Sequence, residues 1–423
     1  MKKIKLYKFF MWRIIRNIGL FIKWGLFSSF TGIVVGAFST LFAFCLKKAT
    51  NFRMAYPQMI FLLPLGGVMI VFLYSIFKYK NDKGTNLVLS TIHAKSEIPF
   101  KMAPLIFIST IITHLFGGSA GREGAALQLG GSIGNQLGRW FKFDEKDRRI
   151  VVMCGMSAAF SAIFGTPIAA SIFAMEVGSV GVMYYAALVP CVFSSLVASK
   201  FAIDMGIRPN VFHIMNMPEF HVIPSIKIII LAVCCAAVSV VFCVVLHSLG
   251  DFYREKLKNP YIRIIVSSLI IILLTVILHT SDYMGAGVEV IERAISGKVN
   301  PSAFIWKIIF TALTLEAGFK GGEIVPSFYV GATFGCLFGQ IIGISPSLCA
   351  AVGMIAVFCG VTNCPITSML IAFELFGYDA VPYFLIAISV SYFMSGYYGL
   401  YHAQTIVYSK YKAEYINRKT KNL

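Results

Sequence analysis

Long, unbroken apolar runs dominate the hydrophobic pattern of the chain. Each run spans roughly 18 residues or more, the length that an α-helix needs to cross a bilayer. Apolar and polar residues do not alternate within these runs, as they would in the strands of a membrane barrel. Since only helices and closed barrels satisfy their backbone hydrogen bonds in lipid, the pattern predicts an all-α integral membrane protein. The runs cover residues 24–46, 58–77, 150–175, 180–203, 225–248, 262–279 and 380–397.

Composition supports the same fold class. Of 423 residues, 57% are hydrophobic and 13% are charged, and the mean hydropathy is +0.77. Soluble domains contain about 25% charged residues, so this chain is far too apolar for that class. Its ten cysteines are scattered at spacings that fit no metal site. We therefore expect neither a metal nor any other cofactor.

The charge distribution predicts how the chain sits in a cell membrane. The formal net charge is +18, and the basic residues concentrate at both ends and in short loops. The positive-inside rule assigns such segments to the cytoplasm, so the excess charge does not indicate a nucleic-acid partner. We expect residues 1–23 to form a basic amphipathic helix on the inner surface. Residues 406–423 are expected to form a short basic cytoplasmic tail without a soluble regulatory domain.

The chain contains an internal repeat. Residues 118–138 read "GSAGREGAALQLGGSIGNQLG" and residues 318–339 read "GFKGGEIVPSFYVGATFGCLFG". A second pair of similar segments starts at residues 155 and 353. An ordered series of matches at a nearly constant offset indicates two related halves. The matched pairs, 198 to 201 residues apart, are Gly118 and Gly318, Gly121 and Gly321, Glu123 and Glu323, Gly130 and Gly331, Gly134 and Gly335, Gly138 and Gly339, Gly155 and Gly353, Pro167 and Pro365, and Glu176 and Glu374.

The repeat divides the membrane region into two halves. We predict the halves at residues 24–203 and 226–405, with an external linker over residues 204–225. If both termini are inside and the linker is outside, each half crosses the membrane an odd number of times. The two repeats then have inverted topology, which is common among secondary transporters.

The glycines of the repeat have two predicted roles. Gly130, Gly134 and Gly138 are spaced by four, so they share one helix face and allow close packing in lipid. The glycines further upstream precede a predicted helix start. Its unpaired N–H groups and the positive end of its dipole suit an anion. Two such starts, related by the repeat, predict an anion site near the middle of the membrane.

Glu123 stands at one of these helix starts. An ionised carboxylate there can occupy the anion site and a protonated one can leave it, so one hypothesis is a gate that carries a proton. The other hypothesis is a helix cap paired with Arg122. The sequence leaves both open. A membrane-embedded hydrolase is disfavoured, because Glu123 and Glu323 occupy equivalent positions and no nucleophile lies near them. We expect no enzymatic activity.

The GREG motif, the glycine stripe and the inverted repeat resemble the CLC family of chloride channels and transporters, over about residues 25–410. The resemblance implies a homodimer in which each subunit holds its own pathway. It also implies that Glu123 is the gating glutamate and that Tyr401 is the central tyrosine. The further positions that the resemblance implies for the anion site are Gly124, Ala125, Gly322, Ile324, Thr85 and Asn86.

Departures from the chloride-handling members refine the expected substrate. Where those members have a GSGIP-type motif, this chain reads "GTNLVL", with Thr85 or Asn86 near the serine position. Ala125 replaces the proline that usually follows the GREG motif. Val177 stands where proton-coupled chloride exchangers carry a second acid. Glu323, in "GGEIVP", is an additional carboxyl at the ion.

Together these departures resemble the fluoride/proton antiporter branch of the family. That resemblance implies export of cytoplasmic fluoride in exchange for protons, and hence fluoride resistance. The alternative is a chloride/proton exchanger or a chloride channel of the same fold.

The chemistry of fluoride agrees with a second carboxyl group. Fluoride is small and strongly hydrated, so removing its water requires strong hydrogen-bond donors. Protonated Glu323 and protonated Glu123 would each offer an O–H donor. The ring edges of Phe328 and Tyr329 can also face an anion, although packing in the core is the role that we favour for both.

Three further acids are expected to have structural roles. Glu176 and Glu374 end matching apolar helices, so we expect them to mark the membrane boundary. Glu316 precedes the second glycine segment and is expected to form a structural pair with Lys320.

Overall fold

The computed structural model describes residues 2–79, 84–93 and 98–420. Six of its described helices are long and apolar enough to cross a membrane. Many large apolar side chains remain exposed, among them Leu26 at 71% and Val222 at 74%. Exposing such side chains to water is unfavourable, so these surfaces suit lipid. The six spans are Phe10–Ala55, Pro57–Ile76, Tyr185–Asp204, Val222–Lys256, Pro260–Leu278 and Ile324–Ile342.

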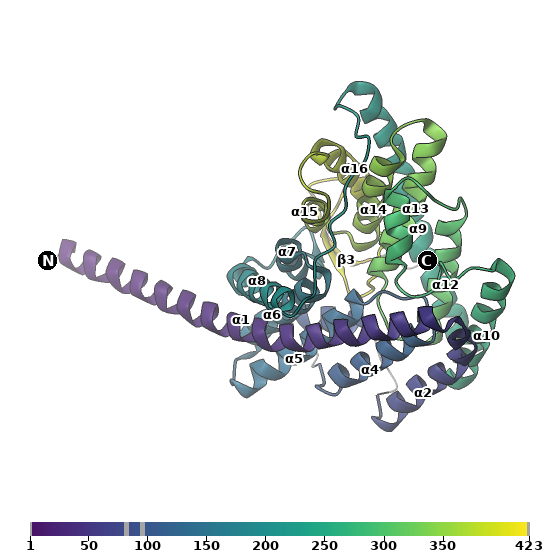
Figure 1. The fold of residues 1–423 in the computed structure, drawn as a ribbon. Helices are drawn as coiled ribbons and strands as arrows, with labels where there is room; N and C mark the ends of the chain where they lie inside the picture. Colours follow the sequence, from purple (N-terminus) through teal and green to yellow (C-terminus); the bar gives the residue numbers. More distant parts are fainter. Residues whose placement is uncertain (1, 80–83, 94–97, 421–423) are drawn as a thin grey trace.

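The two halves of the chain lie side by side, the first coloured purple to teal and the second green to yellow (Figure 1). The first half comprises α1 (Lys2–Ala55), η1 (Pro57–Leu62), α2 (Leu63–Ile76), α3 (Thr85–His93), α4 (Met102–Leu115), α5 (Glu123–Trp140), α6 (Glu145–Phe164), α7 (Pro167–Glu176), β1 (Ser179–Val180), η2 (Tyr185–Ala187) and α8 (Leu188–Asp204). The second half comprises α9 (Val222–Lys256), α10 (Pro260–Leu278), α11 (Val288–Ile295), α12 (Ala303–Ala317), α13 (Ile324–Ile342), α14 (Pro346–Thr362), α15 (Pro365–Phe376), α16 (Val381–Met394), β2 (Thr405–Tyr408) and β3 (Tyr415–Lys419).

The glycine stripe packs one helix tightly on the next in each half, as the sequence predicted. A Cβ added at Gly130 of α5 would lie 2.1 Å from the carbonyl oxygen of Gly155 in α6. A Cβ added at Gly331 of α13 would lie 2.3 Å from the carbonyl oxygen of Gly353 in α14. Neither position has room for a larger residue, because real Cβ atoms do not approach backbone so closely. Both halves therefore build the same helix pair around the same small residues.

The apolar run over residues 150–175, predicted as one span, is two helices. Gly165, with φ of 79°, ends α6, and Pro167 starts α7. The second half breaks at the matching place, where Asn363, with φ of 57°, ends α14 and Pro365 starts α15. A left-handed residue closes a helix and proline suits the first turn of the next, which explains both breaks.

The glutamates at the ends of α7 and α15 join the two halves. Glu176, at the end of α7, accepts hydrogen bonds from the N–H groups of Ile366 and Thr367 at the start of α15, at 3.0 and 2.8 Å. Glu374, in the last turn of α15, accepts bonds from the N–H groups of Ile168 and Ala169 at the start of α7, at 2.9 and 2.8 Å. Each carboxylate thus caps the helix that corresponds to its own. The exchange is reciprocal, as a two-fold relation between the halves requires.

The first helix is longer than the sequence led us to expect. The predicted surface helix over residues 1–23 and the following span form the single helix α1, whose N-terminal end projects away from the remainder of the chain (Figure 1). Gly19 and Gly25 do not interrupt it, since glycine lowers helix stability without blocking the hydrogen bonds. Residue 23 therefore does not coincide with the end of an element.

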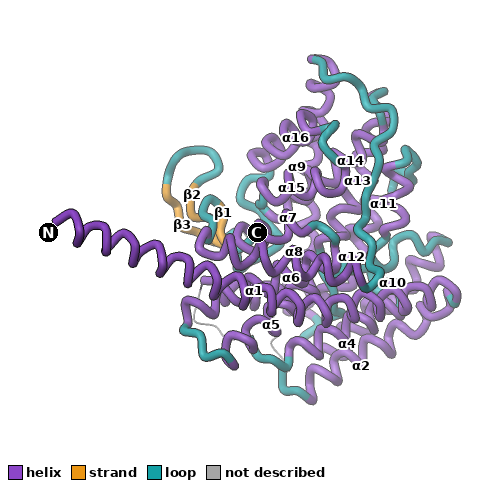
Figure 2. The backbone as a smooth tube through the Cα atoms, turned by 60° about the vertical axis from the view of Figure 1, so that its left-hand side comes forward, coloured by secondary structure: helices purple, strands orange, loops and turns teal. Residues whose placement is uncertain are grey.

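The C-terminal segment adds a small sheet to the helical fold (Figure 2). Strand β2 runs parallel to β1, pairing Ser179 with Thr405, and antiparallel to β3, pairing Ile406 with Arg418. The segment predicted as a basic tail thus reaches back to the first half, and its last three residues lie outside the described range. These strands follow the last long helix, where backbone groups can pair without lying in lipid.

Lys410, in the turn between β2 and β3, anchors this sheet to the helices. Its ammonium group donates hydrogen bonds to Asn363 Oδ1 and to the carbonyl of Tyr392, the latter at 3.0 Å. Asn363 Nδ2 in turn donates to Gln404 Oε1 at 2.9 Å. Burial lowers the pKa of Lys410 to about 8. The turn is therefore held by a partly desolvated cation.

Candidate functional site at the paired helix starts

The two glycine segments of the repeat meet backbone to backbone. The N–H of Gly121 donates to the carbonyl of Gly322 at 2.7 Å, and the N–H of Gly322 donates to the carbonyl of Gly121 at 2.9 Å. A Cβ added at Gly322 would lie 2.4 Å from the backbone nitrogen of Gly124, so a larger residue does not fit there. This reciprocal pair brings the starts of α5 and α13 together, as the repeat predicted.

Glu123 is the first residue of α5 and is completely buried. Its Oε2 accepts a hydrogen bond from the N–H of Arg122 at 3.0 Å, and its Oε1 lies 3.5 Å from Arg122 Nε. The expected pairing with Arg122 therefore exists. Within the described structure, however, Oε1 receives no hydrogen bond. Buried carboxylate oxygens are rarely left in that state, so this oxygen is a place for a proton or a polar ligand.

Glu323 directly precedes α13. Its Oε2 also lacks a hydrogen-bond partner among the described residues. A Cβ added at Gly124 would lie 3.4 Å from this oxygen and 3.3 Å from Thr85 Oγ1. One small region beside Gly124 is therefore bordered by a carboxyl from the second half and a hydroxyl from the first.

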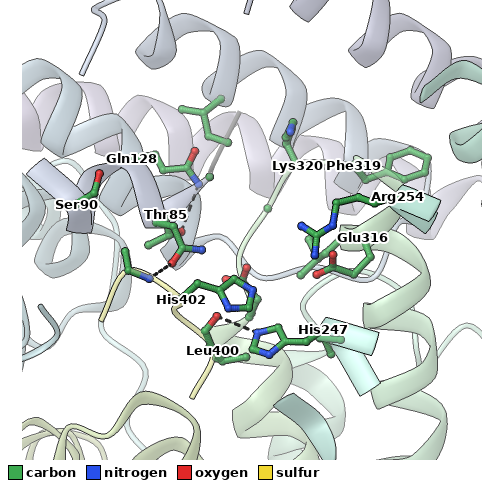
Figure 3. A pocket seen from close by; sticks show the side chains of 18 of the residues that line it. Thr85, Ser90, Gln128, His247, Arg254, Glu316, Phe319, Lys320, Leu400 and His402 are labelled. Carbon is green, nitrogen blue, oxygen red and sulfur yellow. Dashed lines mark hydrogen bonds between the residues drawn. The ribbon is translucent and has the colours of Figure 1, made fainter. Parts of the chain in front are cut away.

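Two cavities with different linings lie next to the paired helix starts. One of them, which we name the outer cavity after the orientation proposed below, has a volume of about 800 Å³ and is lined by Arg122, Asn210 and Val288 among others. The same three residues also line a narrow space of about 20 Å³ that reaches Glu123. The other, which we name the inner cavity after the same orientation, is drawn in Figure 3 and has a volume of about 500 Å³. Glu323 lines the inner cavity, whereas Glu123 does not. The two carboxyls thus face different cavities, and neither residue lines both.

The start of α3 forms part of the inner cavity. Thr85 and Asn86 both line it, together with Gln128 of α5. Gln128 Nε2 donates to Thr85 Oγ1 at 3.4 Å, and Asn86 Oδ1 accepts a hydrogen bond from the N–H of Ala403 at 2.9 Å. Sequence reasoning did not single out Gln128. Its position one turn into α5, on the same helix as Glu123, is the signal that could have identified it.

Tyr401 is 1% exposed, and its hydroxyl has no hydrogen-bond partner in the described part of the chain. Its neighbours Leu400 and His402 line the inner cavity. The backbone carbonyl of Tyr401 accepts hydrogen bonds from Thr420 Oγ1 at 2.9 Å and from the N–H of Gln404 at 3.0 Å. The C-terminal segment therefore fixes the position of this tyrosine, a role that its basic composition did not reveal.

The two candidate aromatic residues lie apart. Phe328 lines the narrow space at Glu123 and stacks on Phe164 at 5.5 Å between ring centroids. Tyr329 lies instead 5.0 Å from the ammonium of Lys307. Tyr329 lines none of the cavities described above. The structure therefore brings Phe328, and not Tyr329, to the region of Glu123.

The remaining expected positions lie at the two helix starts. Ala125 and Ile324 are fully buried in the first turns of α5 and α13. The structure thus brings Thr85, Gly124, Gly322 and Glu323 together. Their proximity comes from two helices and a loop that are distant in the sequence.

Lys307 is a buried cation that the sequence analysis passed over. It is completely buried in α12, and its ammonium donates to the carbonyls of Gly285 at 2.7 Å and Tyr283 at 3.2 Å. Buried lysines require such compensation. A lysine inside the apolar stretch "AFIWKIIF" was the available signal.

Comparison with known proteins extends these observations. Residues 66–396 match the family described as voltage gated chloride channel. A "Chloride/fluoride channel protein" of Pseudomonas syringae pv. tomato is 33% identical over 396 residues, which cover 92% of this chain and 88% of that protein. A crystal structure of a CLC-type fluoride/proton antiporter aligns with a TM-score of 0.87 at 32% identity, covering 90% of this chain and 98% of the other. A slow cyanobacterial Cl⁻/H⁺ antiporter shares the fold, with a TM-score of 0.74 at 17% identity, over 88% of this chain and 93% of the other.

Proposed function

The chain belongs to the voltage gated chloride channel family, and we propose that it is a fluoride/proton antiporter that exports cytoplasmic fluoride. It is a multi-pass membrane protein of a transporter family. The relatives named for fluoride are similar to it over about nine-tenths of its length. The inward proton gradient would then drive fluoride out of the cell and give fluoride resistance.

One observation carries the proposal. Two carboxyls stand at two paired helix starts, each facing a different cavity, and each has an oxygen without a hydrogen-bond partner in the described structure. A helix start attracts an anion, and an ionised carboxylate is such an anion held by the chain itself. Protonation removes that attraction. The occupancy of the site by fluoride and the protonation of the carboxyl are therefore linked.

Glu123 acts as the proton-sensitive gate in this scheme. Ionised Glu123 stays beside Arg122 and closes the narrow space below the outer cavity. A proton arriving from the outer cavity neutralises the carboxyl and weakens that ion pair. The side chain can then leave the helix start, and fluoride can take its place beside the N–H groups of Gly124 and Ala125.

Glu323 supplies the preference for fluoride. In its protonated form it offers an O–H donor at the region shared with Thr85 and Gly124. Fluoride accepts hydrogen bonds strongly and must be compensated for lost water, so it gains more from this donor than chloride does. Asn86, Gly322, Ile324 and Tyr401 complete the surroundings of this site.

The arrangement of the protein in the cell follows from the same proposal. We place both termini in the cytoplasm, because the basic segments lie at the ends of the chain. The membrane repeats span residues 24–203 and 226–405, with residues 204–225 outside. The protein works as a homodimer in which each subunit has a complete pathway, and it needs no cofactor.

The proposal is tested with purified protein in liposomes loaded with fluoride or chloride, without a pH gradient. Anion efflux and proton uptake are recorded together. Fluoride efflux with matching proton uptake, and little chloride efflux, is the expected result. Chloride efflux as fast as fluoride efflux would indicate the alternative, a chloride/proton exchanger or channel. Fluoride efflux without proton uptake would indicate a channel and leave Glu323 without its role.

A further inference from the structure

The inner cavity carries a second carboxyl group, Glu316, for which the exchange scheme has no role. Glu316 lies in the last turn of α12, two residues before Gly318, where the helix ends with φ of 118°. Glu316 and Glu323 are the two carboxylates among the described residues that line this cavity. We propose that Glu316 accepts the proton that Glu323 releases and passes it to water on the inner side. This inference rests on the proposed fluoride/proton exchange.

The charge of the cavity explains why such an acceptor is needed. Apart from the two carboxyls, the charged residues that line it in the described part of the chain are basic: Arg254, Lys320 and Lys419. A cavity lined by positive charge concentrates anions and repels cations, including hydronium. Fluoride can therefore reach Glu323 through it readily, whereas a proton leaving Glu323 meets a barrier. A carboxylate inside the cavity lowers that barrier because it accepts the proton locally.

The packing around Glu316 leaves its carboxylate room beside α9. A Cβ added at Gly250 of α9 would lie 2.2 Å from Glu316 Oε2, so the carboxylate occupies space that only glycine leaves free. Arg254, one turn further along α9, has a side chain that is 64% exposed, and it lies beside Glu316 (Figure 3). Glu316 is also within electrostatic range of Glu323. The carboxylate therefore has Glu323 as a neighbour and the more exposed end of α9 beside it.

Among the residues that the structure describes, Glu316 has no hydrogen-bond or ion-pair partner that would hold it in one protonation state. No hydrogen bond or ion pair joins it to another residue in the part of the chain that the structure describes. The pair with Lys320 that we expected from the sequence is absent among these contacts, and the ammonium of Lys320 lies 4.5 Å from the ring centroid of Tyr74. An acid without a committed partner can exchange a proton with water at low cost.

The proposed step moves a single proton. The O–H bond of protonated Glu323 breaks, leaving a carboxylate, and an O–H bond forms on ionised Glu316. Glu316 then gives the proton to a water molecule in the cavity and becomes ionised again. The described charged and titratable groups that line the cavity with Glu316 or lie within electrostatic range of it are His247, Asp251, Tyr253 and Arg254 from α9, Arg263 from α10, Lys320 and Glu323 from the segment after α12, and His402 and Lys419 from the C-terminal segment.

The test compares Glu316→Gln with the unaltered protein in liposomes that contain fluoride. We expect the ratio of proton uptake to fluoride efflux to fall, with proton uptake reduced by about 100-fold, the lower range for loss of a proton-transfer group. Glu255→Gln is the matched control, because it removes an exposed carboxylate from the neighbouring part of α9. Its ratio should stay at that of the unaltered protein.

A second substitution covers the case in which Glu316→Gln does not fold. Glu316→His replaces the carboxyl by an imidazole, a titratable group that is charged when protonated and neutral when not, so the pH profile of proton uptake should differ from that of the unaltered protein. An unchanged ratio in Glu316→Gln, or an unshifted pH profile in Glu316→His, overturns the inference. If the unaltered protein itself does not couple fluoride to protons, the proposed function fails first, and the two failures are distinguishable.

Discussion

Glu123 and Glu323 occupy the same place in the two halves, yet their surroundings differ in two respects. Glu123 follows an arginine that pairs with it, whereas Glu323 follows Gly322. Glu123 reaches the narrow space below the outer cavity, and Glu323 lines the inner cavity. The repeat thus supplies two acids with the same backbone setting, and the cavities give them different access to water.

The glycine beside Glu323 is a steric requirement. The paired segments approach so closely that a Cβ on Gly322 would lie 2.4 Å from the backbone nitrogen of Gly124. An arginine can therefore occupy this position only in the first half. Only one of the two paired segments can carry a large side chain before its glutamate. The two acids therefore have different preceding residues although they are related by the repeat.

The largest expected effects come from removing each acid in turn. Glu123→Gln and Glu323→Gln should each reduce proton uptake by about 100-fold or more, because each removes a proton-carrying group. The transport activity that remains in the two variants should differ in its response to the pH on each side of the membrane. Glu123→Gln should lose its response to the pH of the outer side, and Glu323→Gln should lose its response to the pH of the inner side.

Right-side-out and inverted vesicles allow this measurement, since the pH of either face can then be varied alone. The control is Glu255→Gln, whose side chain is exposed on α9. If both substitutions abolish the response to the same side, the two carboxyls do not serve separate cavities and the comparison drawn above is wrong.

The second effect in size concerns the close approach of the two segments. Gly322→Ala should destabilise the protein by about 1–3 kcal/mol, as overpacking usually does, and should slow fluoride transport. The same change at Gly19 of α1, where no atom lies within 4 Å of an added Cβ, should not destabilise the protein and should leave fluoride transport unchanged. Thermal unfolding in detergent and fluoride efflux from liposomes provide the two readouts. Equal unfolding temperatures for Gly322→Ala and Gly19→Ala would contradict the close contact between Gly322 and the backbone of Gly124.

The sequence could predict those parts of the site that depend on neighbouring residues, but not those that depend on contacts between residues far apart in the chain. Gly130, Gly134 and Glu123 were identifiable because their signals are local: a spacing of four, and a charge next to glycines. The break between α6 and α7 was missed because apolar character continues on both sides of Gly165. The assignment of Glu123 and Glu323 to different cavities depends on contacts between residues about 200 positions apart, which no local pattern contains.

The third difference between the halves concerns the two glutamates that cap α15 and α7. Glu176 is 5% exposed and accepts bonds from two N–H groups and from the hydroxyl of Thr367, whereas Glu374 accepts bonds from two N–H groups alone among the described residues. Replacing a buried, charged acceptor by glutamine leaves helix-start donors poorly compensated, at a cost of about 1–3 kcal/mol. Glu176→Gln should therefore lower the unfolding temperature more than Glu374→Gln does.

Thermal unfolding of both variants in the same detergent provides the measurement. A larger loss for Glu374→Gln would indicate that the start of α7, rather than that of α15, depends more on its cap. Transport need not change if the protein remains folded, because neither glutamate lines the cavities at Glu123 or Glu323.

The smallest expected effect concerns Lys410, which ties the C-terminal sheet to the helices behind Tyr401. Burial lowers the pKa of Lys410 to about 8, while the unfolded chain has the ordinary value of about 10.4. Between these two values the unfolded chain binds more protons than the folded one, so stability rises with pH in that window. Below about pH 8 the cost of burying the charged group is fully present.

Lys410→Met has no such group. The difference in unfolding temperature between the unaltered protein and this variant should therefore grow in favour of the unaltered protein from pH 8 to 10. A difference that stays flat or shrinks over this range would mean that the bonds to Asn363 and Tyr392 favour the charged form more than burial opposes it.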